Sequence, residues 1–481
     1  MCRKSICTII LILLLTLSFG TESVEAANFV KGPYMLYPGN NSQMTVLWQL
    51  DGTTSCTLEW GQDTSYSDGS TVTTEYNSDY QHKFTIPSLT PGSRYYYRVT
   101  TDSTSATGSF MAAPPTSAAS VQLIAYGDTR SQPEMQELVN AEMLAAGSAY
   151  QTIILHSGDW VNMDKDSYWQ EEWFDSSWPN MHEIRLNVPF NGCWGNHESK
   201  GRYYEKFYPY PYVNDQYWSF DYGPVHVSVI DQSVSYGTNS PQYAWLENDL
   251  ATTDREWLFI LLHKPGYSAG GHANEGAVQS YIQPLCVQYG VDIVFAGHNH
   301  YYARTTVDGV KHVTTGGGGA PLRDIANPGD VEVGVSAYHF CKVDISGTQL
   351  DFSVVDINGI VIDSFTLTHE LDTTPPSPDP MTWSTLPYAT GDSSIAMEAT
   401  TATDTSGVEY YFTCVSGGGS DSGWQNDTNY EDTGLSAATQ YCYSVKARDK
   451  SPNQNTTADS TTECATTEPT PTSTPTPTPT P

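Results

Sequence analysis

The most informative part of the chain is Phe295-Ala296-Gly297-His298-Asn299-His300, in which two histidines stand two residues apart. It follows the largely apolar residues Val291-Asp292-Ile293-Val294, whose length and composition predict a short buried strand. A strand that ends in Gly-His-x-His can bring two imidazoles to one edge of a sheet, and neutral imidazole is a common metal ligand. The stretch therefore predicts a metal site at the carboxyl end of a buried strand.

Four other segments repeat this arrangement, in which an apolar strand runs directly into residues able to bind a metal. Their apolar runs have the length of strands rather than helices, and Gly marks the turn in most of them. Because ligands gather beyond the carboxyl ends of strands in an open sheet, we expect the polar residues to converge on one crevice. The segments are Leu123-Ile124-Ala125-Tyr126-Gly127-Asp128, Ile153-Ile154-Leu155-His156-Ser157-Gly158-Asp159, Gly195-Asn196-His197-Glu198 and Leu258-Phe259-Ile260-Leu261-Leu262-His263.

The candidate metal ligands in these segments are oxygen and imidazole donors. A donor set without thiolate suits Mn, Fe, Zn or similar ions. The candidates are Asp128, Asp159, Asn196, His263, His298 and His300.

The ordered series Gly-Asp, Gly-Asp, Gly-Asn-His-Glu, His and Gly-His-x-His resembles the calcineurin-like metallophosphoesterase superfamily. The resemblance runs from about residue 121 to residue 365. Residues 217–226 and 314–322 are similar to the purple-acid-phosphatase-like branch, in which an N-terminal fibronectin-III-like domain precedes the catalytic domain. The resemblance implies an α/β catalytic domain in which helices flank two packed sheets.

The resemblance also implies two metal ions (Fe, Zn or Mn, with the identity open) that are bridged by the carboxylate of Asp159. Asn196, His263 and His298 would complete the ligands of one ion, and Asp128 and His300 would belong to the other. In this family pattern, metal-bound hydroxide attacks phosphorus in line, opposite the ester oxygen.

Two histidines would handle the phosphate in the implied reaction. His197 directly follows Asn196, and His272 lies in a Gly-rich loop shortly after His263. Each would contact the phosphoryl oxygens or protonate the leaving group, and general acid help of this kind is worth roughly 100- to 10,000-fold in rate. The implied catalytic residues are His197, His272 and Asp159, and the implied substrate-binding residues are Arg130, Asn196, His197 and His272.

Two positions depart from the family pattern. Coloured members carry a Tyr three residues after the bridging Asp, where this chain has Asn162, so we expect no phenolate–iron chromophore. Many members carry a His two residues after the first Asp, where this chain has Arg130, whose guanidinium stays protonated and cannot ligate a metal. Asn162 could supply an amide oxygen instead. Two roles are open for Arg130: it could clamp the substrate phosphate bidentately, or it could form an ion pair with Glu198 or another acid.

Other polar residues near the motifs have structural interpretations. His156 lies inside an apolar run and is expected to be a core histidine, and His226 alternates with valines in a predicted strand. Glu198 is expected to orient a ligand or an arginine rather than to react.

The chain of 481 residues is too long for a single core, so several domains are expected. Basic residues, an apolar run and small residues up to Ala26 predict a signal peptide, and hence a secreted or cell-surface protein with no transmembrane segment. The expected division is a signal peptide over 1–26, a fibronectin-III-like sandwich over 28–113, the catalytic domain over 118–370, a second fibronectin-III-like module over 374–467, and an extended Thr/Pro-rich tail over 468–481.

In the C-terminal module, residues 410–414 and 441–449 resemble facing strands, with Trp424 as a core candidate. The alternative is a carbohydrate- or surface-binding module, which exposed aromatic side chains would indicate. Seven cysteines remain beyond the leader, an odd count. One disulfide is expected among Cys414, Cys442 and Cys464, and the sequence leaves the pairing open.

The charge balance is strongly acidic, with 54 acidic and 21 basic residues and a formal net charge of −33. Proteins that bind polyanions usually carry a basic patch, so a bulk nucleic acid partner is disfavoured. Small phosphate esters remain suitable substrates, because bound metals would dominate the local field.

These observations together predict a secreted metal-dependent phosphoesterase, most simply a phosphomonoesterase of the acid-phosphatase type. A phosphodiesterase or nucleotidase is the nearest alternative, and relative rates on monoester and diester substrates would separate the two. A surface-adhesion protein with impaired catalysis is the third hypothesis, because of Arg130 and Asn162.

Overall fold

The structure is a computed structural model that describes residues 27–471 apart from 53–54, 77–78, 103, 199–200, 371 and 452. The predicted signal peptide over 1–26, and the predicted tail from 472 onward, lie outside the described residues. No helix within the described part of the chain is long and apolar enough to span a bilayer.

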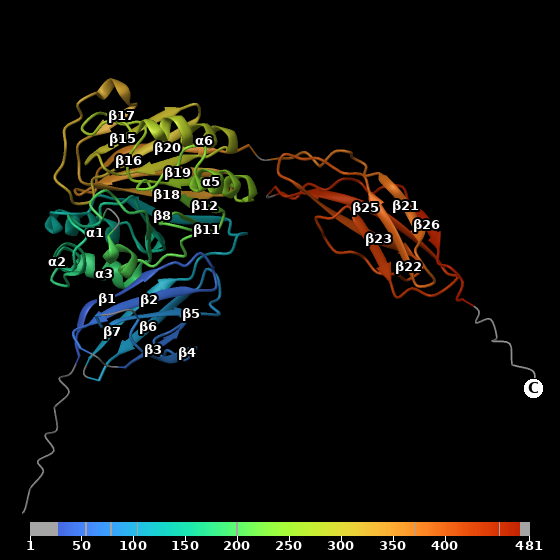
Figure 1. The fold of residues 1–481 in the computed structure, drawn as a ribbon, viewed down its shortest axis with the longest axis horizontal. Helices are drawn as coiled ribbons and strands as arrows, with labels where there is room; N and C mark the ends of the chain where they lie inside the picture. The colour runs from blue at the N-terminus through green and yellow to red at the C-terminus, as the bar shows by residue number, and fades with distance from the viewer. Residues whose placement is uncertain are drawn as a thin grey trace, which may run out of the picture.

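The N-terminal domain is all-β and consists of two sheets that share one core (Figure 1). The sheets have the orders β1-β2-β5 and β4-β3-β6-β7. In β6, Tyr95, Tyr97 and Val99 are buried and alternate with more exposed residues, which is the two-residue period of a strand with one face on a core. The strands are β1 Phe29–Leu36, β2 Met44–Leu50, β3 Cys56–Gly61, β4 Gly69–Thr73, β5 Gln81–Ile86, β6 Arg94–Thr100 and β7 Ser105–Met111.

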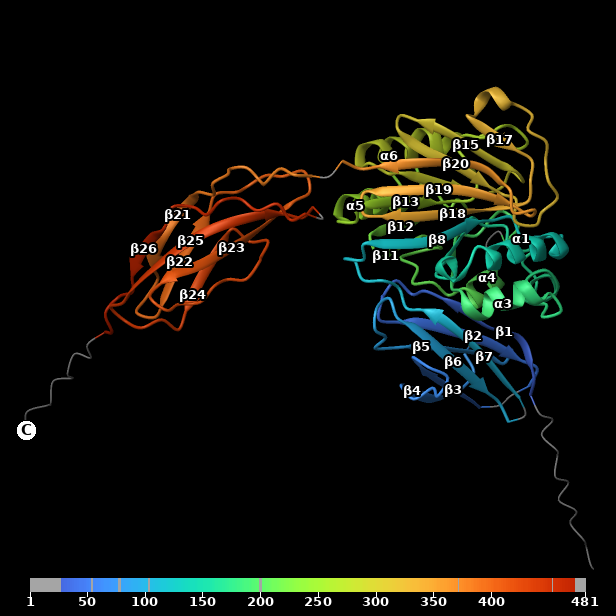
Figure 2. The ribbon, with the colours of Figure 1, turned by 180° about the vertical axis from the view of Figure 1, so that it is seen from behind.

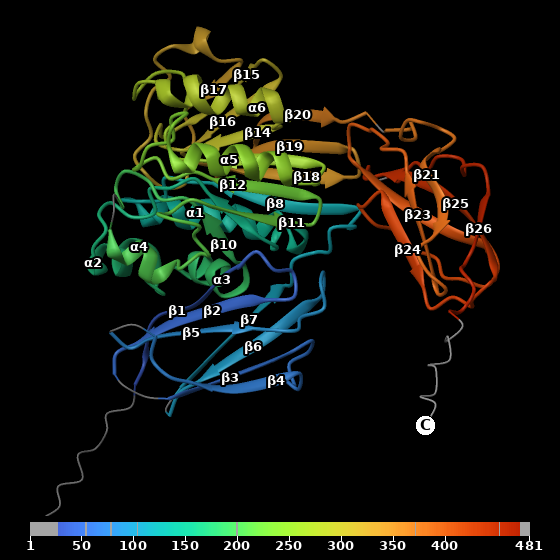
Figure 3. The ribbon, with the colours of Figure 1, turned by 45° about the vertical axis from the view of Figure 1, so that its right-hand side comes forward.

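Helix α3 (Pro179–Asn187) of the central domain lies next to the N-terminal domain (Figures 1 and 3), and hydrogen bonds fasten the two together. The Tyr97 hydroxyl donates to the Leu186 carbonyl at 2.9 Å, and the Ser109 amide donates to the Asn187 side chain at 2.8 Å. The buried Asn191 side chain exchanges two hydrogen bonds with the backbone of Tyr37, at 2.9 and 3.0 Å. The N-terminal domain therefore supports the strand Phe190–Gly192, which contains Asn191.

The central α/β domain contains two sheets, with the orders β10-β9-β8-β18-β19-β20 and β11-β12-β13-β14-β16-β15-β17. Figure 2 shows β8, β18, β19 and β20 side by side in the first of them. Within the first sheet β8, β9 and β10 are parallel, and within the second β12, β13, β14 and β16 are parallel. The strands are β8 Ser120–Tyr126, β9 Ile154–His156, β10 Phe190–Gly192, β11 Trp218–Tyr222, β12 Val225–Val229, β13 Trp257–Leu261, β14 Ile293–Ala296, β15 Tyr302–Val307, β16 Val310–Thr315, β17 Val333–Val335, β18 His339–Ser346, β19 Gln349–Asp356 and β20 Val361–Thr368.

Both faces of the second sheet are buried, which explains its continuous apolar strands. In β13, Phe259 and Leu261 enter the core between the sheets, while Ile260 faces the helices on the other side. Across that core, Phe295 stacks on Phe352 with 6.3 Å between ring centroids. The expectation of an α/β domain with two packed sheets flanked by helices is confirmed.

Helices α5 and α6 cover the outer face of the second sheet (Figure 3), α1 packs on the first sheet, and α3 lies between α1 and strands β1 and β7 of the N-terminal domain. The helices are α1 Pro133–Ala145, α2 Asp166–Tyr168, α3 Pro179–Asn187, α4 Arg202–Phe207, α5 Pro241–Thr252 and α6 Gln283–Tyr289, with short 3₁₀ or π-helical segments at Ser148–Tyr150, Trp169–Phe174, Val278–Ile282 and Pro328–Asp330.

The C-terminal region is β-rich and forms two sheets, β21-β22-β24 and β23-β25-β26, drawn apart from the other domains in Figure 1. Cys442 and Cys464 lie opposite each other on β25 and β26 and form the disulfide, so Cys414 is not part of it. The strands are β21 Trp383–Ala389, β22 Ser394–Ala399, β23 Val408–Ser416, β24 Asn429–Thr433, β25 Gln440–Asp449 and β26 Glu463–Thr466.

Two expectations for this region are wrong. The segments expected to face each other are hydrogen-bonded neighbours in one sheet, with Tyr410 opposite Ala447. Trp424 is not a core residue: it is half-buried, its ring lies 5.3 Å from that of Tyr411, and the Arg448 guanidinium lies 4.2 Å from its centroid. An indole covered by a guanidinium gains a cation–π contact outside the core, which explains its position.

Candidate metal centre

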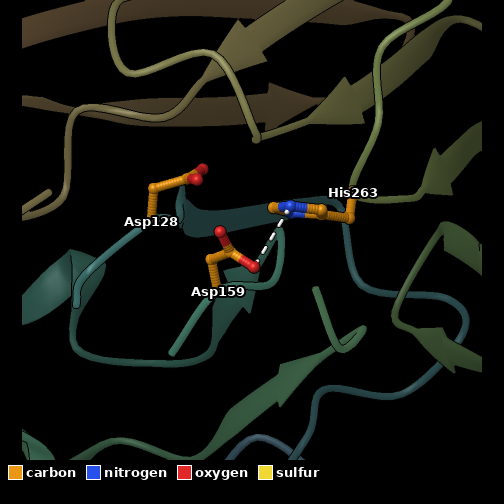
Figure 4. Close-up of side chains that lie close together, drawn as sticks. All are labelled: Asp128, Asp159 and His263. Carbon is orange, nitrogen blue, oxygen red and sulfur yellow. Dashed lines mark ion pairs between the residues drawn. The ribbon is translucent and has the colours of Figure 1, made fainter. Parts of the chain in front are cut away.

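Five of the predicted ligands come together where four strands end. Asp128 follows β8, Asp159 follows β9, His263 follows β13, and His298 and His300 follow β14. Asp128, Asp159 and His263 are buried, and each offers a ligand atom within 4.8 Å of those of the other two (Figure 4). β8 and β9 belong to the first sheet and β13 and β14 to the second, so the packing of the two sheets brings the carboxyl ends of these strands together.

Three residues of the site have strained backbone conformations. Asp128, Asp159 and His298 have φ values of 55°, 55° and 69°, in the left-handed region that residues other than glycine rarely adopt. Two glycines allow close approach: a Cβ on Gly195 would lie 2.0 Å from Asp159 Oδ1, and one on Gly297 would lie 2.2 Å from Asp128 Oδ2. Non-glycine residues in such conformations cluster at functional sites.

Three acceptor atoms face one another around His263. Its Nε2 lies 3.2 Å from Asp159 Oδ1 and 3.0 Å from Asn196 Oδ1. Its Nδ1 lies 2.9 Å from the Ser157 carbonyl, which only accepts, so Nδ1 carries the proton. Burial lowers the pKa of His263, so the ring is neutral and Nε2 presents a lone pair to the two oxygens. Three converging lone pairs fit a bound cation, and these donors suit a divalent metal ion.

His298 and His272 border the same position. The His298 ring lies 5.0 Å from that of His263 and stacks on the His272 ring at 4.0 Å. Burial, together with His263 and His272, lowers the pKa of His298 to about 2, which keeps the imidazole neutral and able to ligate. Asn196 is exposed, so the site opens to solvent on this side.

The donors on the other side of Asp159 already contact a cation, the guanidinium of Arg130. Arg130 Nε donates to Asp159 Oδ2 at 3.2 Å, Nη1 donates to Asn162 Oδ1 at 3.3 Å, and Nη2 lies 3.2 Å from His300 Nε2. The sequence left two roles open for Arg130. The ion pair is present, and the partner of Arg130 is Asp159 rather than Glu198. The acceptor atoms around Arg130 already bind its guanidinium, so they do not fit a second metal ion as the atoms around His263 fit the first.

Electrostatics separate the two central carboxyls. Burial and the neighbouring charge of Asp159 raise the pKa of Asp128 well above its usual value. Burial also opposes ionisation of Asp159, but His263, His197 and Arg130 outweigh it and hold the pKa of this group below its usual value. Asp159 is therefore the permanently ionised carboxylate at the centre of the site.

His197 faces Asp159 from the open side. Its backbone amide donates to Asp159 Oδ1 at 3.1 Å, and its Nδ1 donates to the Asn162 carbonyl at 2.7 Å. This hydrogen bond orients the ring so that Nε2 lies 3.8 Å from Asp159 Oδ2. The ring is half-buried, so Nε2 is accessible to a substrate at this side of the site.

Glu198 anchors two of the loops that carry these residues. It is buried, and it accepts hydrogen bonds from the amides of Asp159 at 3.1 Å, Val161 at 3.0 Å and Gly195 at 2.8 Å. Burial and the charge of Asp159 raise the pKa of Glu198 to about 8. Its position ties the Asp159 loop to the loop that carries Asn196 and His197.

Sequence reasoning missed three residues that position this site. Glu172 Oε2 accepts from the amides of Ser131 and Asn162 at 3.0 and 2.7 Å, and Gln232 Oε1 accepts from the His263 amide at 3.0 Å. Asn299 Oδ1 accepts from the His272 amide at 2.7 Å. Only Asn299 had a sequence signal, since it stands between the two histidines of the last motif.

His156 lies beneath the site and packs as a core residue. It is fully buried, its ring stacks on Trp160 at 3.8 Å, and its Nδ1 accepts from the Gly158 amide at 3.2 Å. We expect His156→Ala to destabilise the fold by about 2–4 kcal/mol, because it leaves a cavity and an unpaired buried amide. Thermal unfolding measures the loss, and the specific activity of the folded variant should stay near that of the wild type. A loss of specific activity equal to that of a ligand variant would contradict this division of roles.

Comparison with known protein families agrees with this arrangement. Residues 132–302 match the family described as calcineurin-like phosphoesterase, and residues 32–112 match the family described as purple acid phosphatase, N-terminal domain.

Curated relatives carry the same names. Purple acid phosphatase 18 of Arabidopsis thaliana is 39% identical over 116 residues, which are 21% of this chain and 26% of that protein. A purple acid phosphatase of Glycine max is 29% identical over 292 residues, which are 54% of this chain and 60% of that protein. This chain therefore covers less than two thirds of either relative. Acid phosphatase type 7 of Homo sapiens is 24% identical over 402 residues, 69% of this chain and 89% of that protein.

Solved structures show the same fold. Purple acid phosphatase PPD1 from yellow lupin (Lupinus luteus) seeds has a TM-score of 0.60 at 21% identity, over 70% of this chain and 74% of that one. The structure described as PhoD has a TM-score of 0.53 at 13% identity, over 71% of this chain and 92% of that one. At these identities the likeness concerns the fold alone.

Proposed function

The chain carries a calcineurin-like phosphoesterase domain behind a purple acid phosphatase N-terminal domain, and from this premise we propose that it is a metal-dependent phosphoric ester hydrolase. Its favoured reaction is the hydrolysis of small phosphate monoesters, as in the relatives named acid phosphatases. The nearest alternative within the same chemistry is a phosphodiesterase or nucleotidase.

One observation carries this proposal: the meeting of Asp159 Oδ1, Asn196 Oδ1 and His263 Nε2 around one point, with His298 beside it. Lone pairs repel one another unless a cation or a proton lies between them, and His263 carries its proton on the other nitrogen. When bound there, a divalent or trivalent ion would lower the pKa of water and neutralise charge on a phosphoryl group. Fe, Zn and Mn all suit this donor set.

The protein's own groups would supply binding and proton transfer. His197 is held by its bond to the Asn162 carbonyl with Nε2 toward the site, so it can donate to a phosphoryl oxygen or protonate the leaving group. His272 stacks on His298 and would act on the same side, where Asn196 opens to solvent. The Arg130 guanidinium would attract the phosphoryl group by its charge.

The number of ions is a finer part of the proposal. The family resemblance implies two, with Asp128 and His300 holding the second ion. The contacts support the first ion more strongly than the second, because the ligand atoms around His263 face one another while those around His300 face Arg130.

The first experiment is hydrolysis of para-nitrophenyl phosphate and of bis(para-nitrophenyl) phosphate by the same protein sample. We expect turnover to disappear after chelation and to return when Mn, Zn or Fe is restored, with the monoester preferred. Circular dichroism before and after chelation should be unchanged, because both sheets have cores of their own away from the site.

The alternatives predict other results. Preference for the diester would replace the phosphatase by a phosphodiesterase, while metal dependence would persist. Folded protein that turns over neither ester with any of the three metals would contradict the proposal and favour the adhesion protein with impaired catalysis.

The remaining sequence-based expectations stay proposals. The domain limits 28–113, 118–370 and 374–467, and the fibronectin-III-like type of the outer two, are kept as predicted. Export to the cell exterior is proposed from residues 1–26. Attachment to a surface or polysaccharide through the C-terminal region remains a prediction, for which the partly exposed Tyr411 and Trp424 are the residues to test.

A further inference from the structure

We propose that the guanidinium of Arg130 takes the place of one of the two metal ions that the family resemblance implies, so that the protein works with a single ion. The inference rests on the proposed function, because it concerns the same site. Arg130 contacts three residues at positions that the resemblance assigns to that ion: the bridging Asp159, Asn162 at the position of the phenolate ligand, and His300.

Arg130 is the donor in each of these contacts, so its guanidinium is the cation at the position that the resemblance assigns to the second ion. His300 Nδ1 lies 2.8 Å from the Pro321 carbonyl and therefore carries the proton, which leaves a lone pair on Nε2. Its lone pair, like those of Asp159 Oδ2 and Asn162 Oδ1, is directed at an N–H group of Arg130. Lone pairs that would ligate an ion are already used by the guanidinium.

The two departures from the family pattern contact each other. Arg130 Nη1 donates to Asn162 Oδ1, so the residue that replaces a His ligand is bound by the residue that replaces a Tyr ligand. Either substitution alone would leave an ion with a partial ligand set. Together they form a hydrogen-bonded pair, which is what a replacement of the ion by an arginine requires.

Arg130 is held in place rather than free to swing aside. Only 11% of its side chain is exposed, and Nη1 also donates to Ser131 Oγ at 3.1 Å. Glu172 Oε2 accepts from the amides of both Ser131 and Asn162 and so clamps together the two loops that form the Arg130 pocket. The contacts with described residues use four of the five N–H groups of the guanidinium, which leaves one for a phosphoryl oxygen.

Metal stoichiometry tests the inference without reference to turnover. The full chain is stripped with a chelator, loaded with Mn²⁺, and analysed by elemental mass spectrometry and electron paramagnetic resonance. We expect one tightly bound ion per chain and the spectrum of an isolated Mn²⁺ ion. Arg130→His, which installs an imidazole that can ligate, is expected to bind two ions and to show the spectrum of an exchange-coupled pair.

Two further variants keep the test decisive. Arg130→Gln removes the charge without adding an imidazole and should also admit a second, weaker ion, which covers the case in which Arg130→His does not fold. Arg255→Gln is the matched control, because Arg255 is 13% exposed and pairs with Asp221 and Asp254, outside the contacts of the site, so one ion should remain.

Each outcome has a distinct meaning. Two ions in the wild type would overturn the inference and leave the proposed function intact. One ion in the wild type and still one in both Arg130 variants would show that Arg130 is not what excludes the second. No tight ion in the folded wild type would refute the proposed metal dependence itself.

Discussion

Asp159→Asn is expected to reduce kcat/KM by at least about 1,000-fold. The change preserves shape but removes the negative charge that pairs with Arg130 and that would hold a metal ion beside His263. Loss of a charged metal ligand withdraws several kcal/mol of transition-state stabilisation, and about 4 kcal/mol corresponds to three powers of ten. Steady-state hydrolysis of the phosphate monoester, with metal content measured on the same sample, checks the prediction.

The matched control is Asp249→Asn. Asp249 is also a largely covered carboxylate with a charged partner, since it lies 3.0 Å from His226 Nε2 and accepts from Ser219 and Ser228. This variant should lose stability but keep its metal content and its specific activity. If Asp159→Asn retained both metal and turnover, Asp159 would not be a ligand and the assignment of the site would be wrong.

His197→Ala is expected to lower kcat by roughly 100- to 10,000-fold for a phosphate ester with a poor leaving group, such as an alkyl phosphate. The loss should be much smaller for para-nitrophenyl phosphate, because that leaving group departs without a proton. The backbone amide that binds Asp159 remains in the variant, so metal content should not change. The measurement is a series of monoesters whose leaving groups span a wide range of pKa values.

This series separates two roles of the imidazole. A residue that only binds the phosphoryl oxygens would raise KM equally for all esters, whatever the leaving group. His272→Ala, measured on the same series, shows which of the two histidines gives the proton. An equal loss across the series for His197→Ala would contradict the role of general acid.

The sequence was sufficient to predict the candidate ligands because their positions depend on local rules. Apolar runs of strand length predict strands, and a ligand that follows such a run lies at a sheet edge. Parallel pairing places Asp128 beside Asp159 in one sheet, and the packing of the second sheet against the first brings His263 to them.

Elsewhere local rules failed. Trp424 was expected in the core, but whether a residue lies inside depends on which face of a sheet it covers and on neighbours such as Arg448. The pairing of Cys442 with Cys464 depends on the register of β25 against β26, which cysteine spacing does not encode.

By itself, then, the sequence determined the fold class of the first two domains and the identity of the residues at the strand ends, because strand periodicity and turn residues are local properties of the chain. The contacts of Arg130 depend on the tertiary structure. Asp159 and Asn162 reach it from the loop after β9 and His300 from the loop after β14, and Glu172 holds the loop of Asn162 against that of Arg130. A hydrogen bond depends on distances of a few ångströms between segments far apart in sequence, and packing of the whole domain sets those distances.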